Sequence, residues 1–328
     1  MMTSRAALML IAALLGSGQL VSPDAAAKGP PRVARVGMFV FSTPTADPSV
    51  SVFREALSRL GWIEGRNLAL EYRYAEGKVE RLPDVAADLA RLKPDLIYAL
   101  GGDVAPFMKR ATSTIPIVAV VSNDPVEVGL VASLARPGGN VTGFTFLLSD
   151  LATKRLEMLH EIAPKASRVA ILWNPDHPDP DFRETQAVTP KLGMRVVSLE
   201  VRRPDDFDGA FQAALRERAD ALIVVSSRLM ALQRRRIVDF AAKQRIPLVT
   251  GWGVWAEHGA LLVYGANIDD IVRRSAAYVD RILKGARPGD LPVERPTTFQ
   301  LVINARVAGA LGLTIPQSLV LRADRLIQ

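Results

Sequence analysis

The 328-residue chain contains no cysteine. This absence excludes disulfide bonds, zinc–thiolate sites and thiol catalysis, and it excludes a lipid-modified N-terminal cysteine. We therefore expect the mature protein to be freely soluble. Histidine is also scarce: His160, His177 and His258 are far apart in the sequence and lack the spacing of a metal site. We expect neither a metal nor a cofactor.

Catalytic motifs are missing as well. The mature chain has no Walker A loop and no Gly-x-Ser-x-Gly elbow after a strand, which argues against an enzyme. Gly251–Ala256 (GWGVWA) fits the Gly-x-Gly-x-x-Ala pattern of a dinucleotide site, but that site needs a helix directly afterwards, and here the strand-like Leu261–Tyr264 follows. We interpret the segment as a strand-end loop that turns Trp252 and Trp255 towards a cleft. The alternative is that both indoles fill a core.

The chain carries a net charge of +7, but its basic residues are scattered. The densest run, Arg234–Arg236, falls within a helical pattern and is typical of a solvated helix face. The charge therefore does not predict nucleic-acid binding. A hydrophobic content of 49% excludes a disordered chain.

The first 27 residues predict a cleaved signal peptide. Arg5 precedes an apolar run, Ala6–Leu15, and the segment ends in the small residues Ala25–Ala27. The apolar run is too short for a membrane span, which needs about 20 residues. We expect a periplasmic mature protein.

The remaining chain is long enough for two domains and repeats one pattern, an apolar run followed by a polar loop and a helical segment. The predicted strands are Arg35–Phe41, Leu68–Tyr72, Asp95–Leu100, Ile115–Val121, Arg168–Trp173, Arg195–Val201, Ala221–Val225 and Ile246–Thr250. The predicted helices include Val52–Leu60, Val126–Leu134, Leu151–Ile162, Phe182–Leu192, Asp206–Arg216 and Met230–Lys243. Strands that are apolar on both faces and alternate with helices predict parallel sheets covered on both sides.

Two such units would place a ligand site between them, because ligands bind beyond the carboxyl ends of parallel strands. Polar groups do follow these strand ends. Gly102 and Asp103 would let backbone amides approach a carboxylate, unless Asp103 only caps a helix. Asp124, after Asn123, would either cap the next turn or receive an ammonium group.

The second set of strands offers similar alternatives. Trp173, before Asn174, would face the cleft or pack beneath it. Ser226 would bond a polar ligand. Each residue alone is a weak signal, and their shared position at strand ends is what favours a binding site.

Long segments resemble a family of exported substrate-binding proteins of ABC transporters with the type I periplasmic-binding fold. The strongest match is Asp124–Gly143 (DPVEVGLVASLARPGGNVTG). Further matches are Gly61–Gly77, Arg110–Val118, Ser167–Trp173, Tyr264-Gly265, Tyr278–Gly285, Asp290–Pro296, Phe299–Asn304, Ala310–Pro316 and Arg322–Asp324.

The resemblance implies two Rossmann-like α/β lobes with a ligand cleft between them. The N-terminal lobe would comprise residues 32–143 and about 266–296, and the C-terminal lobe residues 144–265 and about 297–328. Crossings would lie at Asn140–Thr145, Tyr264–Asn267 and near Arg295–Phe299. By position, the family's pocket would fall on Ser42, Thr43, Gly102, Asp103, Asn123, Asp124, Trp173, Asn174, Ser226, Gly251, Trp252 and Tyr264.

Two departures from the family pattern affect the ligand. Asp103 stands where members often have a small hydroxyl residue, which favours an amine there over a carboxylate. Gly251–Trp255 differs from the commoner loop, so ligand identity cannot be carried over.

The resemblance implies a non-enzymatic periplasmic protein that captures a small solute by hinge closure and delivers it to an ABC permease, without inserting into the membrane. Some members of the family take aromatic amino acids, especially tryptophan, and many have unassigned ligands. We expect an aromatic amino acid or related aromatic acid. A ligand-sensing module for a membrane receptor, or a sugar or purine binder on the same fold, are the alternatives. We expect a monomer.

Overall fold

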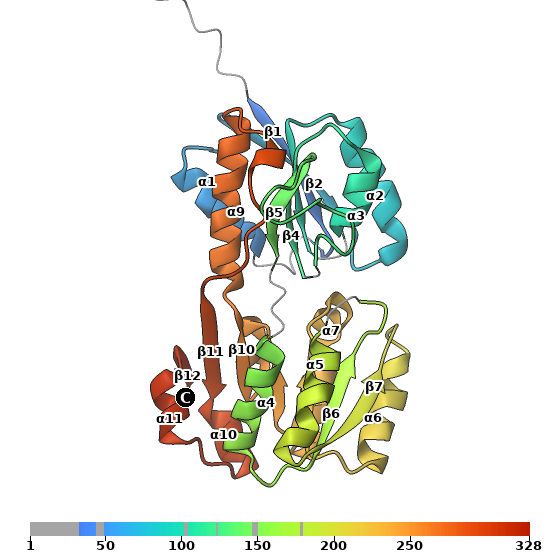
Figure 1. Ribbon diagram of the computed structural model, residues 1–328, viewed down its shortest axis with the longest axis vertical. Coiled ribbons are helices and arrows are strands. Elements are labelled where there is room, and N and C mark those ends of the chain that lie inside the picture. Colours follow the sequence, from blue (N-terminus) through green and yellow to red (C-terminus); the bar gives the residue numbers. More distant parts are fainter. Residues whose placement is uncertain (1–32, 44–48, 102–103, 123, 146–149, 178–179) are drawn as a thin grey trace, which may run out of the picture. The chain divides into compact units, whose positions relative to one another are not determined.

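Two β-sheets, each covered by helices on both faces, make up the described part of the protein (Figure 1). The computed structural model describes residues 33–43, 49–101, 104–122, 124–145, 150–177 and 180–328. The predicted signal peptide, residues 1–27, lies outside this part, as do Gly102, Asp103 and Asn123. Residues 33–328 cluster as one compact unit.

The first sheet has the strand order β2-β1-β3-β4-β5 and is parallel throughout. Its strands are β1 (Ala34–Val40), β2 (Leu68–Tyr74), β3 (Leu96–Leu100), β4 (Ile117–Val121) and β5 (Val141–Thr145). Every residue of β3 and β4 is buried, as expected for central strands with helices on both sides.

The helices of this sheet form two layers. They are α1 (Ser49–Arg59) and α9 (Ile268–Leu283) on one face, and α2 (Leu82–Arg91) and α3 (Val104–Ala111) on the other, with the 3-10 turn η1 (Val79–Arg81) before α2 (Figure 1). The α9 helix is distant in sequence but packs beside α1, where Trp62 Nε1 donates a hydrogen bond of 2.9 Å to Asp280.

The second sheet has the order β12-β11-β10-β9-β8-β6-β7 and is parallel except where β10 meets β11. Its strands are β6 (Arg168–Trp173), β7 (Arg195–Glu200), β8 (Ala221–Val224), β9 (Leu248–Thr250), β10 (Leu262–Ala266), β11 (Phe299–Asn304) and β12 (Arg325–Ile327). Its helices and 3-10 turns are α4 (Asp150–Ile162), α5 (Asp181–Val188), η2 (Thr189–Leu192), α6 (Asp206–Arg216), α7 (Arg228–Leu232), α8 (Arg234–Gln244), η3 (Gly253–His258), α10 (Ala305–Leu311) and α11 (Gln317–Arg322). The remaining 3-10 turn, η4 (Pro288–Asp290), lies beside β5 of the first sheet.

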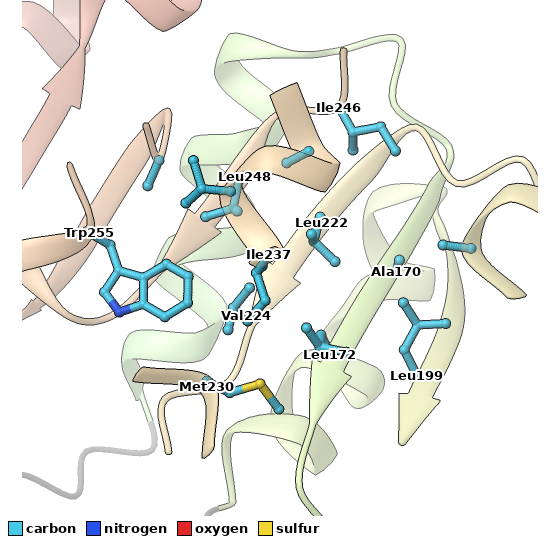
Figure 2. Close-up of a cluster of buried hydrophobic side chains, with 14 of the residues drawn as sticks. Ala170, Leu172, Leu199, Leu222, Val224, Met230, Ile237, Ile246, Leu248 and Trp255 are labelled. Atoms are coloured by element: carbon cyan, nitrogen blue, oxygen red, sulfur yellow. The ribbon is translucent and has the colours of Figure 1, made fainter. Parts of the chain in front are cut away.

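The helices α6 and α8 cover one face of this sheet together with η3, and α4, α5, α10 and α11 cover the other. Figure 2 shows the first of these cores, in which the Trp255 indole lies among aliphatic side chains that include Leu248, Val224 and Met230. Trp255 is 1% exposed. The alternative that this indole fills a core is therefore the correct one, and the expectation that it faces a cleft is wrong.

The connections between the sheets run close together. The chain leaves β10 at Ala266 and starts α9 at Ile268, while Glu294 pairs with β5 before the chain returns to the second sheet at Phe299. The backbone N–H of Asn267 donates a hydrogen bond of 3.1 Å to the Thr298 carbonyl, which ties the two connections together. The segment 140–145, expected as a crossing, contains the edge strand β5 of the first sheet, and the chain leaves that sheet only after Thr145.

Two helix predictions are wrong. The segment Val126–Leu134 forms turns, because the Asp124 side chain binds the first amides and Gly129 takes a φ of 69°, which ends any helical run. The segment Met230–Lys243 belongs to two helices that meet at Gln233. Among the described residues, no helix has the length and apolar character needed to cross a membrane.

Candidate functional site

The predicted site residues of the first sheet follow its strand ends. Ser42 and Thr43 come directly after β1 and are half-buried. Asp124 follows β4, and its Oδ1 accepts hydrogen bonds from the amides of Val126 at 2.7 Å and Glu127 at 3.2 Å. Asp124 therefore caps a turn in this structure, which was one of its two expected roles.

Trp173, the aromatic residue at the end of β6, is held by residues that pack on the second sheet. The Trp173 ring stacks on Phe182 with the centroids 3.9 Å apart, and its Nε1 donates to Ser198 Oγ at 2.9 Å. Its neighbour Asn174 accepts the amide of Asp176 at 3.0 Å, which closes a local turn. One face and the polar edge of the Trp173 indole are thus occupied by protein groups, although the ring stays half-buried.

A buried ion pair underlies the loop that follows β9. Arg155 of α4 pairs with Asp181 of α5, and Arg155 Nη1 also donates to the Tyr264 carbonyl at 3.3 Å. Gly251 lies against this guanidinium, since a Cβ atom at position 251 would stand 2.4 Å from Arg155 Nη1 and 3.4 Å from Ser226 Oγ. The structure therefore brings three predicted site residues, Ser226, Gly251 and Tyr264, together around Arg155.

Ser226 differs from the other hydroxyls of this region. Its Oγ is buried and makes no hydrogen bond to any residue that the structure describes. The whole residue is 8% exposed. Because a buried hydroxyl without a partner is unfavourable, this atom is a place where a bound solute would supply the missing hydrogen bond.

The two indoles after β9 take different positions. Trp252 is half-buried, packs on the edge of the core shown in Figure 2 and accepts the amide of Trp255 at its carbonyl oxygen at 3.0 Å. Trp255 is wholly inside that core. Of the two, Trp252 is the one with surface available for a ligand.

Contacts also join strand ends of the first sheet to loops of the second. The Arg228 guanidinium carbon lies 3.8 Å from the centroid of the Phe41 ring. Ser122 Oγ, after β4, is 3.2 Å from His177 Nε2, and both residues are buried. These contacts bring the carboxyl ends of strands from both sheets close together, which is the arrangement expected for a cleft site.

Sequence reasoning missed Arg155, Asp181, His177, Phe41 and Arg228. Arg228 had a usable signal, because it lies two residues after Ser226 at the same strand end. Arg155 had none, since a charged residue within an amphipathic helix is normally read as solvent-facing.

Other features of the described residues do not compete with this region. A surface hollow between β7 and α6 is lined by Glu200, Arg203, Asp206 and their neighbours, and it contains none of the predicted site residues. Within the described ranges, no group of His, Asp and Glu residues is arranged to hold a metal ion.

Comparison with known proteins identifies the family. A family model described as ABC transporter substrate binding protein matches residues 35–327. The chain belongs to this family. The family resemblance noted in the sequence is thereby confirmed.

Individual relatives extend this finding. The substrate-binding protein is 26% identical over 272 residues to a tyrosine-binding protein of Clostridioides difficile (strain R20291), with 82% of this chain and 78% of the relative covered. It is also similar to an ABC domain from Streptococcus pneumonia solved in complex with L-Trp, with a TM-score of 0.80, 23% identity, and 90% and 99% of the two chains covered. A conserved domain protein from Vibrio cholerae gives a TM-score of 0.79 at 28% identity, over 90% of this chain and 100% of that one. These structures confirm the predicted α/β fold.

Proposed function

We propose that this substrate-binding protein captures an aromatic amino acid or a related aromatic acid and delivers it to the permease of an ABC importer. The observation that carries the ligand class is the likeness to the tyrosine-binding protein, which extends over most of both chains. The half-buried rings of Trp173 and Trp252 support it, because exposed indole area at strand ends offers stacking surface to an aromatic solute.

The mechanism that we propose is hinge closure of two lobes. The N-terminal lobe comprises residues 32–143 and about 266–296, and the C-terminal lobe residues 144–265 and about 297–328. The two separate sheets support this division. A ligand that contacts both lobes only in the closed state shifts the population towards closure.

The proposed pocket comprises residues of both lobes. In addition to Gly102, Asp103 and Asn123, which lie outside the described residues, the pocket residues are Ser42, Thr43, Asp124, Trp173, Asn174, Ser226, Gly251, Trp252 and Tyr264. Ser226 is the best supported, because its buried hydroxyl has no partner among the described residues.

The proposed role as a solute-binding protein also implies a location, a non-catalytic action and an oligomeric state. Export by the segment 1–27 would place the protein in the periplasm, where it would meet the permease. The protein would bind its solute without converting it, and a monomer would suit docking through both lobes.

A thermal-shift screen tests the proposal. Protein that has been refolded to remove co-purified ligand is screened against amino acids, aromatic acids, sugars and purines. A ligand at 100 times its dissociation constant stabilises the folded state by about 2.7 kcal/mol, which corresponds to several degrees of melting temperature. A shift confined to aromatic amino acids and aromatic acids is the expected result. Shifts with sugars or purines alone would contradict the ligand class and leave the family role intact.

A further inference from the structure

The connection that returns to the second sheet is held by side chains of α9, the helix that begins directly after the outgoing connection. Thr298 Oγ1 donates a hydrogen bond of 3.0 Å to Asp270 Oδ2, and Arg274 Nη1 donates one of 3.3 Å to Thr297 Oγ1. Asp270 and Arg274 lie one turn apart, with 3.9 Å between Oδ2 and Nη1. Two neighbouring side chains of one helix thus hold two consecutive residues just before β11.

Arg274 is in turn anchored to the first sheet. Its guanidinium pairs with Glu294, whose Oε1 also accepts the Tyr278 hydroxyl at 2.6 Å. The backbone of Glu294 pairs with β5, because its N–H donates to the Gly143 carbonyl at 3.0 Å and its carbonyl accepts the Thr145 N–H at 2.9 Å. The chain is therefore attached to the first sheet at Glu294, and the two threonine contacts lie just beyond this attachment.

The position of Thr298 ties these contacts to the second sheet. Thr298 directly precedes Phe299, the first residue of β11, and its carbonyl accepts the N–H of Asn267 from the outgoing connection. The strand β11 pairs with β10, which carries Tyr264 of the proposed pocket. Because hinge motions are absorbed by a few residues at the ends of elements, the direction of the chain at 297–298 sets the direction of the second sheet.

In this structure the path that α9 holds accompanies contact between strand ends of the two sheets. Ser122 Oγ lies 3.2 Å from His177 Nε2, and the Arg228 guanidinium lies over the Phe41 ring. If the segment 297–298 were free to take other paths, a smaller fraction of ligand-free molecules would keep these strand ends together. The apparent affinity for a solute that contacts both sets of strand ends falls with that fraction.

We propose that Asp270 and Arg274 are positioning residues for solute capture, which hold the segment 297–298 and so keep the strand ends of the two sheets together before a solute binds. The inference rests on the proposed function, because it assigns the setting of the hinge to two side chains outside the proposed pocket. Both residues act through the direction of the chain and not through contact with the solute.

The test removes the two threonine hydroxyls with almost no change of side-chain shape. Thr297→Val, Thr298→Val and the double variant are made, together with Arg274→Lys, which keeps the charge but lacks the planar fork that reaches Glu294 and Thr297 at once. Both threonines are exposed, so their variants should fold. Thr114→Val is the matched control, because Thr114 is an exposed threonine before the amino end of β4, whereas the crossings follow the carboxyl end of β5.

Spin labels report the separation of the strand-end loops. The chain has no cysteine, so labels attach only at the introduced Glu80→Cys in η1 and Arg235→Cys in α8. These positions flank a contact between the two loops, since a Cβ atom at Gly77 would stand 2.9 Å from Leu232 Cδ1. Double electron–electron resonance gives the label distances without and with solute. Calorimetry gives the affinities for L-tryptophan and L-tyrosine, and circular dichroism and melting temperature verify folding.

The label distances should be longer in the ligand-free threonine variants and in Arg274→Lys than in the wild type, and unchanged in Thr114→Val. Affinity should fall by about 5- to 10-fold in the same variants, the lower part of the range for coupling between separate sites. Saturating solute should restore the distance of the liganded wild type. Unchanged label distances would overturn the inference, and so would longer distances without any loss of affinity.

The design separates this inference from the proposed function, because the label distance in the ligand-free protein does not depend on a solute. Longer distances in the threonine variants of a protein that binds neither aromatic amino acid would support the inference and overturn the aromatic ligand class. Unchanged distances in a protein that binds L-tryptophan or L-tyrosine would overturn the inference and support the aromatic class. Unchanged distances without binding of either solute would overturn both.

Discussion

The indole of Trp173 and the ring of Phe182 lie nearly parallel, with an angle of 4° between their planes and 3.9 Å between their centroids. The pair links the end of β6 to α5, so that the strand-end indole of Trp173 is held by a helix that packs on the same sheet. Stacked pairs of this kind contribute about 0.5–1.5 kcal/mol beyond the burial of their area.

Replacing Phe182 with leucine should therefore lower the free energy of unfolding by about 1–2 kcal/mol, through loss of the stack and of some buried area. The change is measured by urea denaturation followed through tryptophan fluorescence. Ser198→Ala removes only the hydrogen bond to Trp173 Nε1 and should cost about 1 kcal/mol. A Phe182→Leu protein as stable as the wild type would contradict the structural role of the stack.

Asp181→Asn should strongly destabilise the protein. The change leaves the Arg155 guanidinium, whose side chain is 6% exposed, without its countercharge, and losing one partner of a buried pair costs about 3–5 kcal/mol. Glu157→Gln is the control on α4, because its pair with Lys154 is exposed and should change stability by less than about 1 kcal/mol. Similar small effects of both substitutions in urea denaturation would show that Arg155 finds another partner.

Gly251→Ala should destabilise the loop after β9. The added methyl group would meet Arg155 Nη1, which the pair with Asp181 keeps in place, and overpacking of this kind costs about 1–3 kcal/mol. Gly309→Ala lies in α10 with open space around the new Cβ atom and should stabilise by about 0.5–1 kcal/mol. Melting temperatures that move in the same direction for both variants would disprove the expected contact.

Ser226→Ala should weaken ligand binding without lowering the stability of the ligand-free protein. Because Ser226 Oγ has no partner among the described residues, its removal should leave the stability of the ligand-free protein unchanged or slightly higher. Ligand affinity should fall by about tenfold, the equivalent of one hydrogen bond. Thr250→Val is the contrasting variant: its hydroxyl donates to the Val224 carbonyl at 3.1 Å, so that change should lower stability. Unaltered affinity in Ser226→Ala would remove Ser226 from the pocket.

Tyr72→Phe should change the stability profile at high pH. Burial, with a smaller effect of the Glu64 carboxylate, raises the pKa of Tyr72 from 10.0 to about 12. The unfolded chain therefore loses this proton near pH 10, while the folded protein retains it up to about pH 12. The free energy of unfolding keeps the full contribution of neutral Tyr72 below pH 10 and loses it as the pH rises to 12. Unfolding free energies measured from pH 9 to 12 should fall less steeply in Tyr72→Phe. Parallel profiles would contradict the raised pKa.

The sheets could be predicted from the sequence because their strands are apolar on both faces. The strand Arg168–Trp173 and the helix Asp206–Arg216 have the predicted bounds, since polar loops mark their ends. The prediction of a helix at Val126–Leu134 is wrong because the Asp124 carboxylate accepts the amides of the next residues and closes a turn. The spacing of apolar residues does not reveal this contact. The split at Gln233 was missed for a similar reason, as the apolar pattern continues across it.

The strand-end rule located the candidate site, but it could not identify what supports it. Arg155 and Asp181 are 26 residues apart on two helices, and only their packing shows that they form a pair. Arg228 and Phe41 come from different sheets, so their contact depends on how strand-end loops meet and not on local pattern. Trp255 was misjudged because its position after a strand suits both a cleft and a core.

The antiparallel pairing of β10 with β11 has a consequence for the order in which the protein is made. Synthesis runs from the N-terminus, and β11 begins only at Phe299, so until then the edge of β10 has no neighbour on that side. The first sheet also depends on a late segment, because α9, which covers one of its faces, ends at Leu283. Neither sheet can therefore be fully packed until residues beyond Leu283 and Phe299 have left the ribosome, so folding of both sheets is completed late in synthesis.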